Sequence, residues 1–242
     1  MPHFSAAQQK AIDVLARDLD QTFGARLHAL VAYPGNQADG SLHSCAIVEG
    51  LAFRDLAACL PFTEGWHHRG IAVPLMLATG ELERTVDIFP LEYSSILADY
   101  IVVHGSDPFL GMSIPVDDIR RATEGQAKSH LIHLREAFLE SHGETTRLAH
   151  LIASSAAPLR ALLTNIARLP DAAHGPVAAG ALTDEALASL AEKRMGVPAA
   201  LIREILASSA GGFSTVTDPS ALLARYIDAA HRIWAYVDGW RS

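Results

Sequence analysis

A glycine-bearing turn is the first place where this sequence could do chemistry. An apolar run ends in Pro34-Gly35-Asn36, and Gly40 closes the segment. Glycine lets a backbone approach a ligand closely, and successive backbone N–H groups in such a turn can bind an anion. The residue types therefore favour a phosphate site, with Gly35, Asn36, Gly40 and the nearby Ser44 as candidate phosphate-binding residues. The alternative is conformational, because loop glycines commonly supply a positive φ.

A single acid, Asp87, is the candidate metal ligand. The run Thr85-Val86-Asp87-Ile88-Phe89 alternates between side-chain types, which predicts a strand. Carboxylate oxygen is the kind of ligand that Mg²⁺ prefers, so Asp87 could belong to a metal site. It could equally be an acid at the edge of a strand.

Together these segments resemble the nucleotidyltransferase superfamily. Its members carry a Gly-Ser-x-Ala-x-Gly turn, then Asp-x-Asp on the next strand, and a third acid on a later strand. The turn at residues 35–40 fits, with Asn36 in place of the family's serine, and residues 86–88 resemble the third-acid strand. The order of segments from Leu91 to Gly105 is also similar. In that family the acids hold two Mg²⁺ ions, which stabilise the attacking and leaving oxygens.

The resemblance implies an α+β fold, with a nucleotidyltransferase-like mixed sheet and flanking helices followed by an all-α helical bundle. A helical domain after the catalytic domain is common among small-molecule members such as the aminoglycoside nucleotidyltransferases. We therefore expect a nucleotidyltransferase-like domain over residues 1–118 and a helical domain over residues 119–242. The cleft between the two domains is where the resemblance would place a ligand.

The sequence departs from the family where the metal should bind. Ser44-Cys45-Ala46 occupies the place of Asp-x-Asp, so the two acids align with Ser44 and Ala46. Alanine cannot ligate a metal, and a serine hydroxyl is a weak neutral ligand, whereas Mg²⁺ prefers anionic oxygen. Asp87 alone should not assemble a two-metal site. The chain is thus expected to be a pseudoenzyme with no cofactor, and Mg²⁺ enters only if an enzyme survives with displaced acids such as Asp39 or Glu92.

One further acid, Glu124, could take part in catalysis. It projects onto the apolar side of an expected helix together with Arg120, one turn earlier. A buried glutamate needs a partner, so an ion pair with Arg120 is the favoured interpretation. In the enzyme alternative, Glu124 could instead be the general base for an acceptor hydroxyl.

Histidines offer weaker signals. Asp39 and His43 could form a replacement metal site, although a solvated loop pair is the simpler interpretation, and His67-His68 reads as a surface pair in a polar loop. His130 and His133 have a metal-compatible helical spacing, but His133 projects away from the apolar stripe and should face water. The sequence has no Gly-x-Ser-x-Gly elbow, so nothing supports a serine hydrolase.

The elements that must position these residues follow from hydrophobic period and turn signals. Strands crowd the first half of the chain and helices fill the second half. The first half should contain a helix from Ser5, with Gln8 completing a capping box, to Gly24; strands at 26–33, 45–48, 71–77, 85–89 and 100–104; a helix at 51–60 stopped by Pro61; and a short helix capped by Thr79.

The second half should be helical throughout. Helices are expected over 119–138, over 148–169 with a kink at Pro158, near 183–193 and 198–209, and from a cap at Asp218. Trp234, Tyr236 and Trp240 at the end of the last helix are candidate anchors of a homodimer interface. Core packing is the alternative for Trp234.

Composition narrows the classes of partner. The chain has 242 residues, a net charge of −8, and only isolated pairs of adjacent basic residues, Arg120-Arg121 and Lys193-Arg194, so a nucleic-acid partner is not expected. No apolar stretch is long enough for a membrane span. Two cysteines without metal spacing, and a start without a signal-peptide pattern, predict a cytoplasmic protein.

Three functions are compatible with these residues. The leading hypothesis is a catalytically degenerate nucleotidyltransferase-like protein that binds a nucleotide or another small molecule in a regulatory role. The first alternative is an active metal-dependent nucleotidyltransferase acting on a small hydroxylated acceptor. The second is a structural or dimerisation protein.

Overall fold

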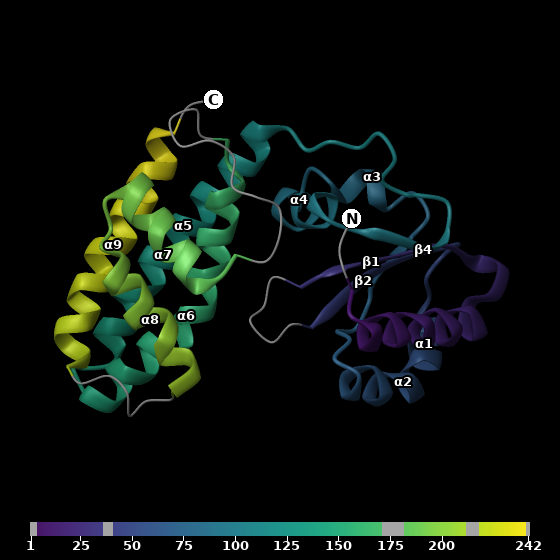
Figure 1. The fold of residues 1–242 in the computed structure, drawn as a ribbon, viewed down its shortest axis with the longest axis horizontal. Helices are drawn as coiled ribbons and strands as arrows, with labels where there is room; N and C mark the ends of the chain where they lie inside the picture. The colour runs from purple at the N-terminus through teal and green to yellow at the C-terminus, as the bar shows by residue number, and fades with distance from the viewer. Residues whose placement is uncertain (1–3, 36–40, 171–181, 212–217, 241–242) are drawn as a thin grey trace. The chain divides into compact units, whose positions relative to one another are not determined.

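The chain divides into two compact units. The computed structural model describes residues 4–35, 41–170, 182–211 and 218–240, and its units are Met1–Ile114 and Pro115–Ser242 (Figure 1). The expected boundary near residue 118 falls in the first turn of the helix that opens the second unit.

A mixed four-stranded sheet forms the centre of the first unit. Its strands are β1 (Leu27–Pro34), β2 (Leu42–Val48), β3 (Leu75–Ala78) and β4 (Ile101–Gly105), in the order β3-β2-β1-β4. β1 runs antiparallel to both β2 and β4, whereas β3 is parallel to β2. The predicted α+β class with a mixed sheet and flanking helices is confirmed.

In the described part of the first unit, five helical segments accompany the sheet. They are α1 (Ala6–Phe23), the 3₁₀ turn η1 (Gly24–Arg26), α2 (Phe53–His68), α3 (Leu82–Thr85) and α4 (Pro90–Ala98). The predicted capping box is present, because Ser5 Oγ accepts from the Gln8 N–H and Gln8 Oε1 accepts from the Ser5 N–H. Gly24 ends α1 with a positive φ of 52°, as its position predicts.

The two faces of the sheet contact different helices. α1 and α2 cover one face, with Ile12, Leu15, Ala32, Ala46 and Trp66 in a shared core. The other face packs against side chains of α3 and α4, and its core includes Val31, Cys45, Ile47, Tyr93 and Ile96. Because neighbouring residues of a strand point to opposite faces, the central strands are divided between these two cores.

Helix α2 runs through Pro61, so its predicted end at that residue is wrong. The indole of Trp66 is fully buried, and its Nε1 donates to Asp18 Oδ2 on α1 over 2.8 Å. Proline removes one helical hydrogen bond, and Pro61 lies on the exposed side of the helix. We infer that burying Trp66 outweighs the loss of that bond.

The segment around Asp87 is a series of turns, so the strand predicted at 85–89 is also wrong. Residues 86–88 follow α3, and Val86 has helical angles of φ −60° and ψ −42°. Thr79 does not cap α3, because Glu81 is the N-cap residue and the Thr79 hydroxyl donates to the carbonyl of Val48 over 3.1 Å. Thr85 instead fixes the segment, since its hydroxyl lies 2.6 Å from the Tyr93 hydroxyl.

Strand β4 ends at a position that only glycine fits. Gly105 has a φ of 73° and pairs with Ala29 of β1. A Cβ atom at this position would lie 1.9 Å from the carbonyl oxygen of His28. The close approach of the two backbones therefore depends on the missing side chain.

An ion pair joins the beginnings of β1 and α2. Arg26 Nη2 donates to Asp55 Oδ1 over 2.7 Å, and the Ala52 N–H donates to Asp55 Oδ2 over 2.9 Å. The Arg26 guanidinium and this backbone donor lower the pKa of Asp55 to about 2. Asp55 thus satisfies a free N–H of the first turn of α2 as well as a cation.

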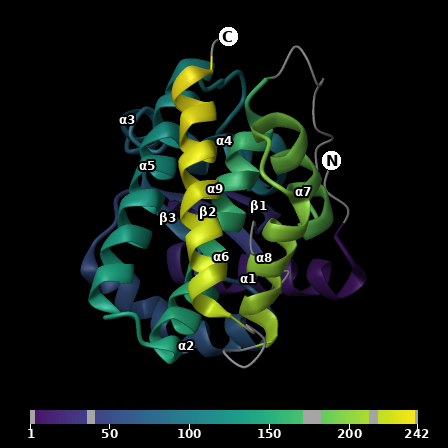
Figure 2. The same cartoon turned by 90° about the vertical axis from the view of Figure 1, so that its left-hand side faces the viewer.

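The second unit consists of helices in its described part. These are α5 (Val116–Glu140), α6 (Thr145–Arg168), α7 (Asp184–Met195), α8 (Ala199–Gly211) and α9 (Pro219–Gly239). Figure 2 shows α9 running along the unit, where it packs against α5 and α6. The predicted cap is present, because Asp218 Oδ1 accepts from the Ala221 N–H. The stripe predicted for α6 is buried from Leu148 to Ile166.

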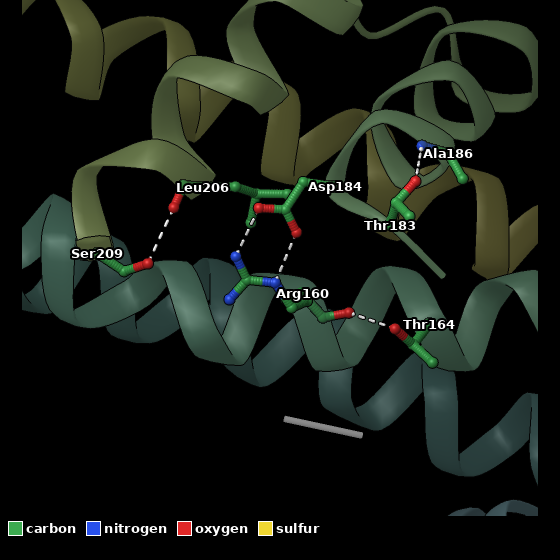
Figure 3. A network of polar contacts seen from close by, with 7 residues as sticks. All are labelled: Arg160, Thr164, Thr183, Asp184, Ala186, Leu206 and Ser209. Carbon is green, nitrogen blue, oxygen red and sulfur yellow. Dashed lines mark hydrogen bonds and ion pairs between the residues drawn. The ribbon is translucent and has the colours of Figure 1, made fainter. Parts of the chain in front are cut away.

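A bidentate ion pair joins α7 to α6. Arg160 of α6 donates from Nε and Nη2 to the two carboxylate oxygens of Asp184, over 2.7 and 2.8 Å (Figure 3). Thr183 caps α7, since its Oγ1 accepts from the Ala186 N–H. This bidentate geometry is stronger than a single contact, and it raises the pKa of Arg160.

The aromatic residues of α9 pack into their own unit. Trp240 is buried, and its Nε1 donates to the carbonyl of Pro170 over 3.0 Å. Trp234 is partly buried beneath Lys128, whose Nζ lies 3.5 Å from the ring centroid. The prediction of an exposed aromatic anchor is therefore wrong for Trp240, and core packing describes Trp234.

Replacing Trp66 with phenylalanine should destabilise the protein. The variant removes the donor to Asp18 and part of a fully buried ring, so we expect a loss of about 1–3 kcal/mol in the free energy of unfolding. Urea denaturation followed by circular dichroism would measure it. Asp18→Asn, which keeps an acceptor, is the control and should lose less. An unchanged midpoint for Trp66→Phe would contradict the account of α2 given above.

Candidate functional site

The predicted glycine turn begins at a close contact between β1 and β2. The N–H of Gly35 donates to the carbonyl of Ser41 over 3.1 Å. A Cβ atom on Gly35 would lie 2.5 Å from His43 Cδ2 and 2.7 Å from the Ser41 carbonyl oxygen. Gly35 is not among the described glycines with positive φ. Close packing, and not a positive φ, therefore explains why a glycine occupies this position.

Four residues form the hairpin site: Tyr33, Gly35, Ser41 and His43. Ser41 Oγ lies 3.1 Å from His43 Nε2, and the rings of Tyr33 and His43 lie 5.8 Å apart between centroids. Tyr33, Ser41 and His43 are partly buried. A hydroxyl, an imidazole and a phenol are thus gathered at the end of the β1–β2 pair. The other predicted turn residues, Asn36, Asp39 and Gly40, lie outside the described residues.

The side chains of β2 point alternately to the two cores. Leu42, Ala46 and Val48 belong to the α1/α2 core. Ser44 shares their parity, and it is paired with Ala32, which lies in the same core. His43 has the opposite parity and shares it with Cys45 and Ile47 of the α3/α4 core. Ser44 and Ala46 therefore point away from the hairpin site.

Ser44 is enclosed by the protein. Its residue is 1% exposed, and its Oγ has no hydrogen-bond partner among the described residues. The structure brings Gly35 together with His43, and it does not bring either of them together with the Ser44 hydroxyl. The family resemblance alone would place Ser44 beside a ligand, because the sequence does not show which face of β2 the residue occupies.

Asp87 is also separated from Ser44 and Ala46 by the sheet. It is exposed in the turn after α3, and its neighbour Val86 packs against the α3/α4 core. Ser44 and Ala46 face the α1/α2 core on the other side. The arrangement expected from the resemblance, in which these three positions share one site, is therefore not formed.

Burial controls the acid–base character of the sheet beside the hairpin site. Burial raises the pKa of the Cys45 thiol to about 12, so the thiol stays protonated at neutral pH and is a poor metal ligand. Burial also raises the pKa of Tyr33, with smaller contributions from Cys45, Tyr93 and Glu92. Tyr33 is a neutral hydroxyl at neutral pH.

Within the described ranges, no group of three or more His, Cys, Asp and Glu side chains is placed to hold a metal ion. Arg120 Nη1 donates to Glu124 Oε2 over 2.7 Å, which confirms the predicted ion pair. His67 and His68 are exposed, as predicted, but they end α2 rather than lying in a loop.

His130 is engaged within the second unit, three residues from an exposed His133. Its Nε2 lies 2.8 Å from the Tyr226 hydroxyl, whereas His133 faces solvent as predicted. Burial, with a smaller contribution from His133, lowers the pKa of His130 to about 4. The neutral imidazole is therefore the form that the fold accommodates.

Sequence comparison adds no family to these observations. No protein-family model matches the chain, and no curated protein is significantly similar to it. The kinship with nucleotidyltransferases stays a prediction. Among the described helices, none combines the length and apolar character needed to cross a bilayer.

Tyr33 and Ser41 were missed in the sequence. Each flanks the glycine turn, and His43 lies two residues after Ser41. The period-two pattern of the strand could have paired Ser41 with His43 on one face. Nothing local in the sequence places Tyr33 against them, because that contact depends on the register between β1 and β2.

Ser44→Ala should stabilise the protein by about 1 kcal/mol, because it removes a buried hydroxyl that lacks a partner. Thermal denaturation would measure the change. Ser155→Ala is the matched control, since that buried hydroxyl donates to the Ile152 carbonyl over 2.9 Å. There the lost hydrogen bond should roughly offset the gain in helix propensity. Destabilisation by Ser44→Ala would mean that the Ser44 hydroxyl makes a stabilising interaction, which would contradict the prediction.

Stability should fall as the pH drops from about 6.5 to 4 because of His130. Its folded-state pKa of about 4 lies below the unfolded value. As the pH falls, the unfolded chain therefore binds the proton before the folded protein does, and this stabilises the unfolded state. We expect a contribution of ~1–3 kcal/mol over that window. Chemical denaturation at several pH values should show a shallower dependence in His130→Gln than in the control His133→Gln. Equal slopes in the two variants would contradict this assignment.

Proposed function

We propose that the protein is a non-catalytic relative of the nucleotidyltransferases that binds a nucleotide or another phosphorylated small molecule at the hairpin site. One observation carries the binding part of this proposal: the side chains of Tyr33, Ser41 and His43 gather at the end of the β1–β2 pair. The non-catalytic part rests on strand β2, which has no carboxylate from Leu42 to Val48. Nucleotidyl transfer by two metal ions requires anionic ligands at that strand in the family that the sequence resembles.

The hairpin site supplies groups suited to binding. Ser41 and Tyr33 carry hydroxyls, and His43 carries an imidazole that can become a cation near a phosphate. Gly35 allows the backbones of β1 and β2 to lie close together, so that the His43 ring packs directly against Gly35. These groups can hydrogen-bond to phosphate oxygens without a metal ion, which supports binding that does not depend on Mg²⁺.

Isothermal titration calorimetry with ATP, GTP and CTP would test the proposal. We expect at least one nucleotide to bind, with a dissociation constant that Mg²⁺ changes by less than about threefold. His43→Ala should weaken binding roughly tenfold, which is the loss of one hydrogen bond to a charged group. Gly35→Ala should weaken it as well, because its methyl group displaces the His43 ring.

His68→Ala is the matched control, because His68 is an exposed histidine at the end of α2. It should leave the affinity unchanged. Failure of all three nucleotides to bind would contradict the ligand assignment. Transfer of AMP to a small hydroxylated acceptor in the presence of Mg²⁺ would contradict the non-catalytic assignment and favour the enzyme alternative.

A further inference from the structure

Helix α2 carries an apolar surface that the hairpin site does not explain. Its inner side buries Asp55, Cys59 and Trp66. Phe53, Leu56 and Leu60, here called the α2 outer face, are 83%, 45% and 67% exposed. Spacings of three and four residues align them on one side of the helix. Aligned apolar side chains of this size on a surface commonly mark an interaction site.

Two opposite charges border the α2 outer face. Arg54 lies near the start of the helix and Glu64 near its end, and both are exposed. Neither forms an ion pair with another of the described residues. Ten residues separate them, which is about 15 Å along a helix at 1.5 Å per residue. The surface therefore has an apolar centre, a cationic end and an anionic end.

We propose that two copies of this chain associate through the α2 outer face, with the two helices antiparallel about a two-fold axis. In this arrangement Arg54 of each copy faces Glu64 of the partner subunit, and Leu56 and Leu60 pack near the axis. A two-fold contact uses the same surface on both copies, so a surface with opposite charges at its two ends complements itself. A parallel pair would instead oppose Arg54 to the partner's Arg54.

The size of the helix sets the expected strength. Sixteen residues of α2 span about 24 Å. A single pair of such helices buries less than the ~1,600 Å² of a standard stable interface. The dimer should therefore dissociate in the micromolar range, and its charge pairs should affect specificity more than affinity.

Analytical ultracentrifugation over about 1–200 μM would test the proposal. The unmodified chain should show a concentration-dependent dimer, and Leu60→Glu should raise the dissociation constant at least tenfold. Leu139→Glu is the matched control, since Leu139 on α5 is 72% exposed and should be silent. Circular dichroism on each variant would establish that it is folded.

A charge exchange tests the antiparallel geometry separately. Arg54→Glu and Glu64→Arg should each weaken the dimer, because each places like charges opposite one another, and the double variant should restore it. A chain that stays monomeric at 200 μM overturns the proposal, as does a dimer insensitive to Leu60→Glu. A monomer that co-sediments with phosphatidylcholine vesicles also overturns it and assigns the surface to lipid.

Discussion

Burial of β2 on both faces is the constraint on which the first unit depends. From Ser44 to Val48 every residue of this strand is buried, and the apolar side chains alternate between two cores, so neither face of this segment is free for a charged group. A carboxylate at Ser44 or Ala46 would be enclosed beneath α1 and α2 without a partner, which is strongly unfavourable. The residues that depart from the pattern of the family that the sequence resembles are therefore residues that this packing requires. The polar side chains lie instead at the end of the β1–β2 pair, where Ser41 and His43 are close to Tyr33.

The features that could be predicted from the sequence depend on local signals. Ser5 and Gln8 cap α1, Gly24 ends it, and Asp218 with Pro219 begins α9, each through contacts within one turn. The apolar period also predicted the buried stripe of α6, whereas the α+β class with a mixed sheet followed from the family resemblance. The local predictions succeed because the residues that specify the element are the residues that form it.

The remaining features depend on partners distant in sequence. Thr85–Phe89 alternates as a strand would, yet it has no neighbouring strand, and the contact between Thr85 and Tyr93 holds it in turns. Pro61 is a valid stop signal that the burial of Trp66 against α1 overrides. For the site, the identities of Gly35 and His43 were visible. Their contact with Tyr33, and the opposite facing of Ser44, follow from the register between β1 and β2.

The sheet order has a consequence for how the chain is made. β1 leaves the ribosome before β4 and lies in the interior of the finished sheet, but its outer neighbour β4 begins only at residue 101. Until that segment leaves the ribosome, the hydrogen-bonding groups along one side of an apolar strand stay unpaired, which is a template for aggregation. Synthesis of the roughly seventy residues between β1 and β4 takes ~4–14 s at ordinary translation speeds. During this interval the unpaired strand can aggregate, and a chaperone that binds it would have its greatest effect.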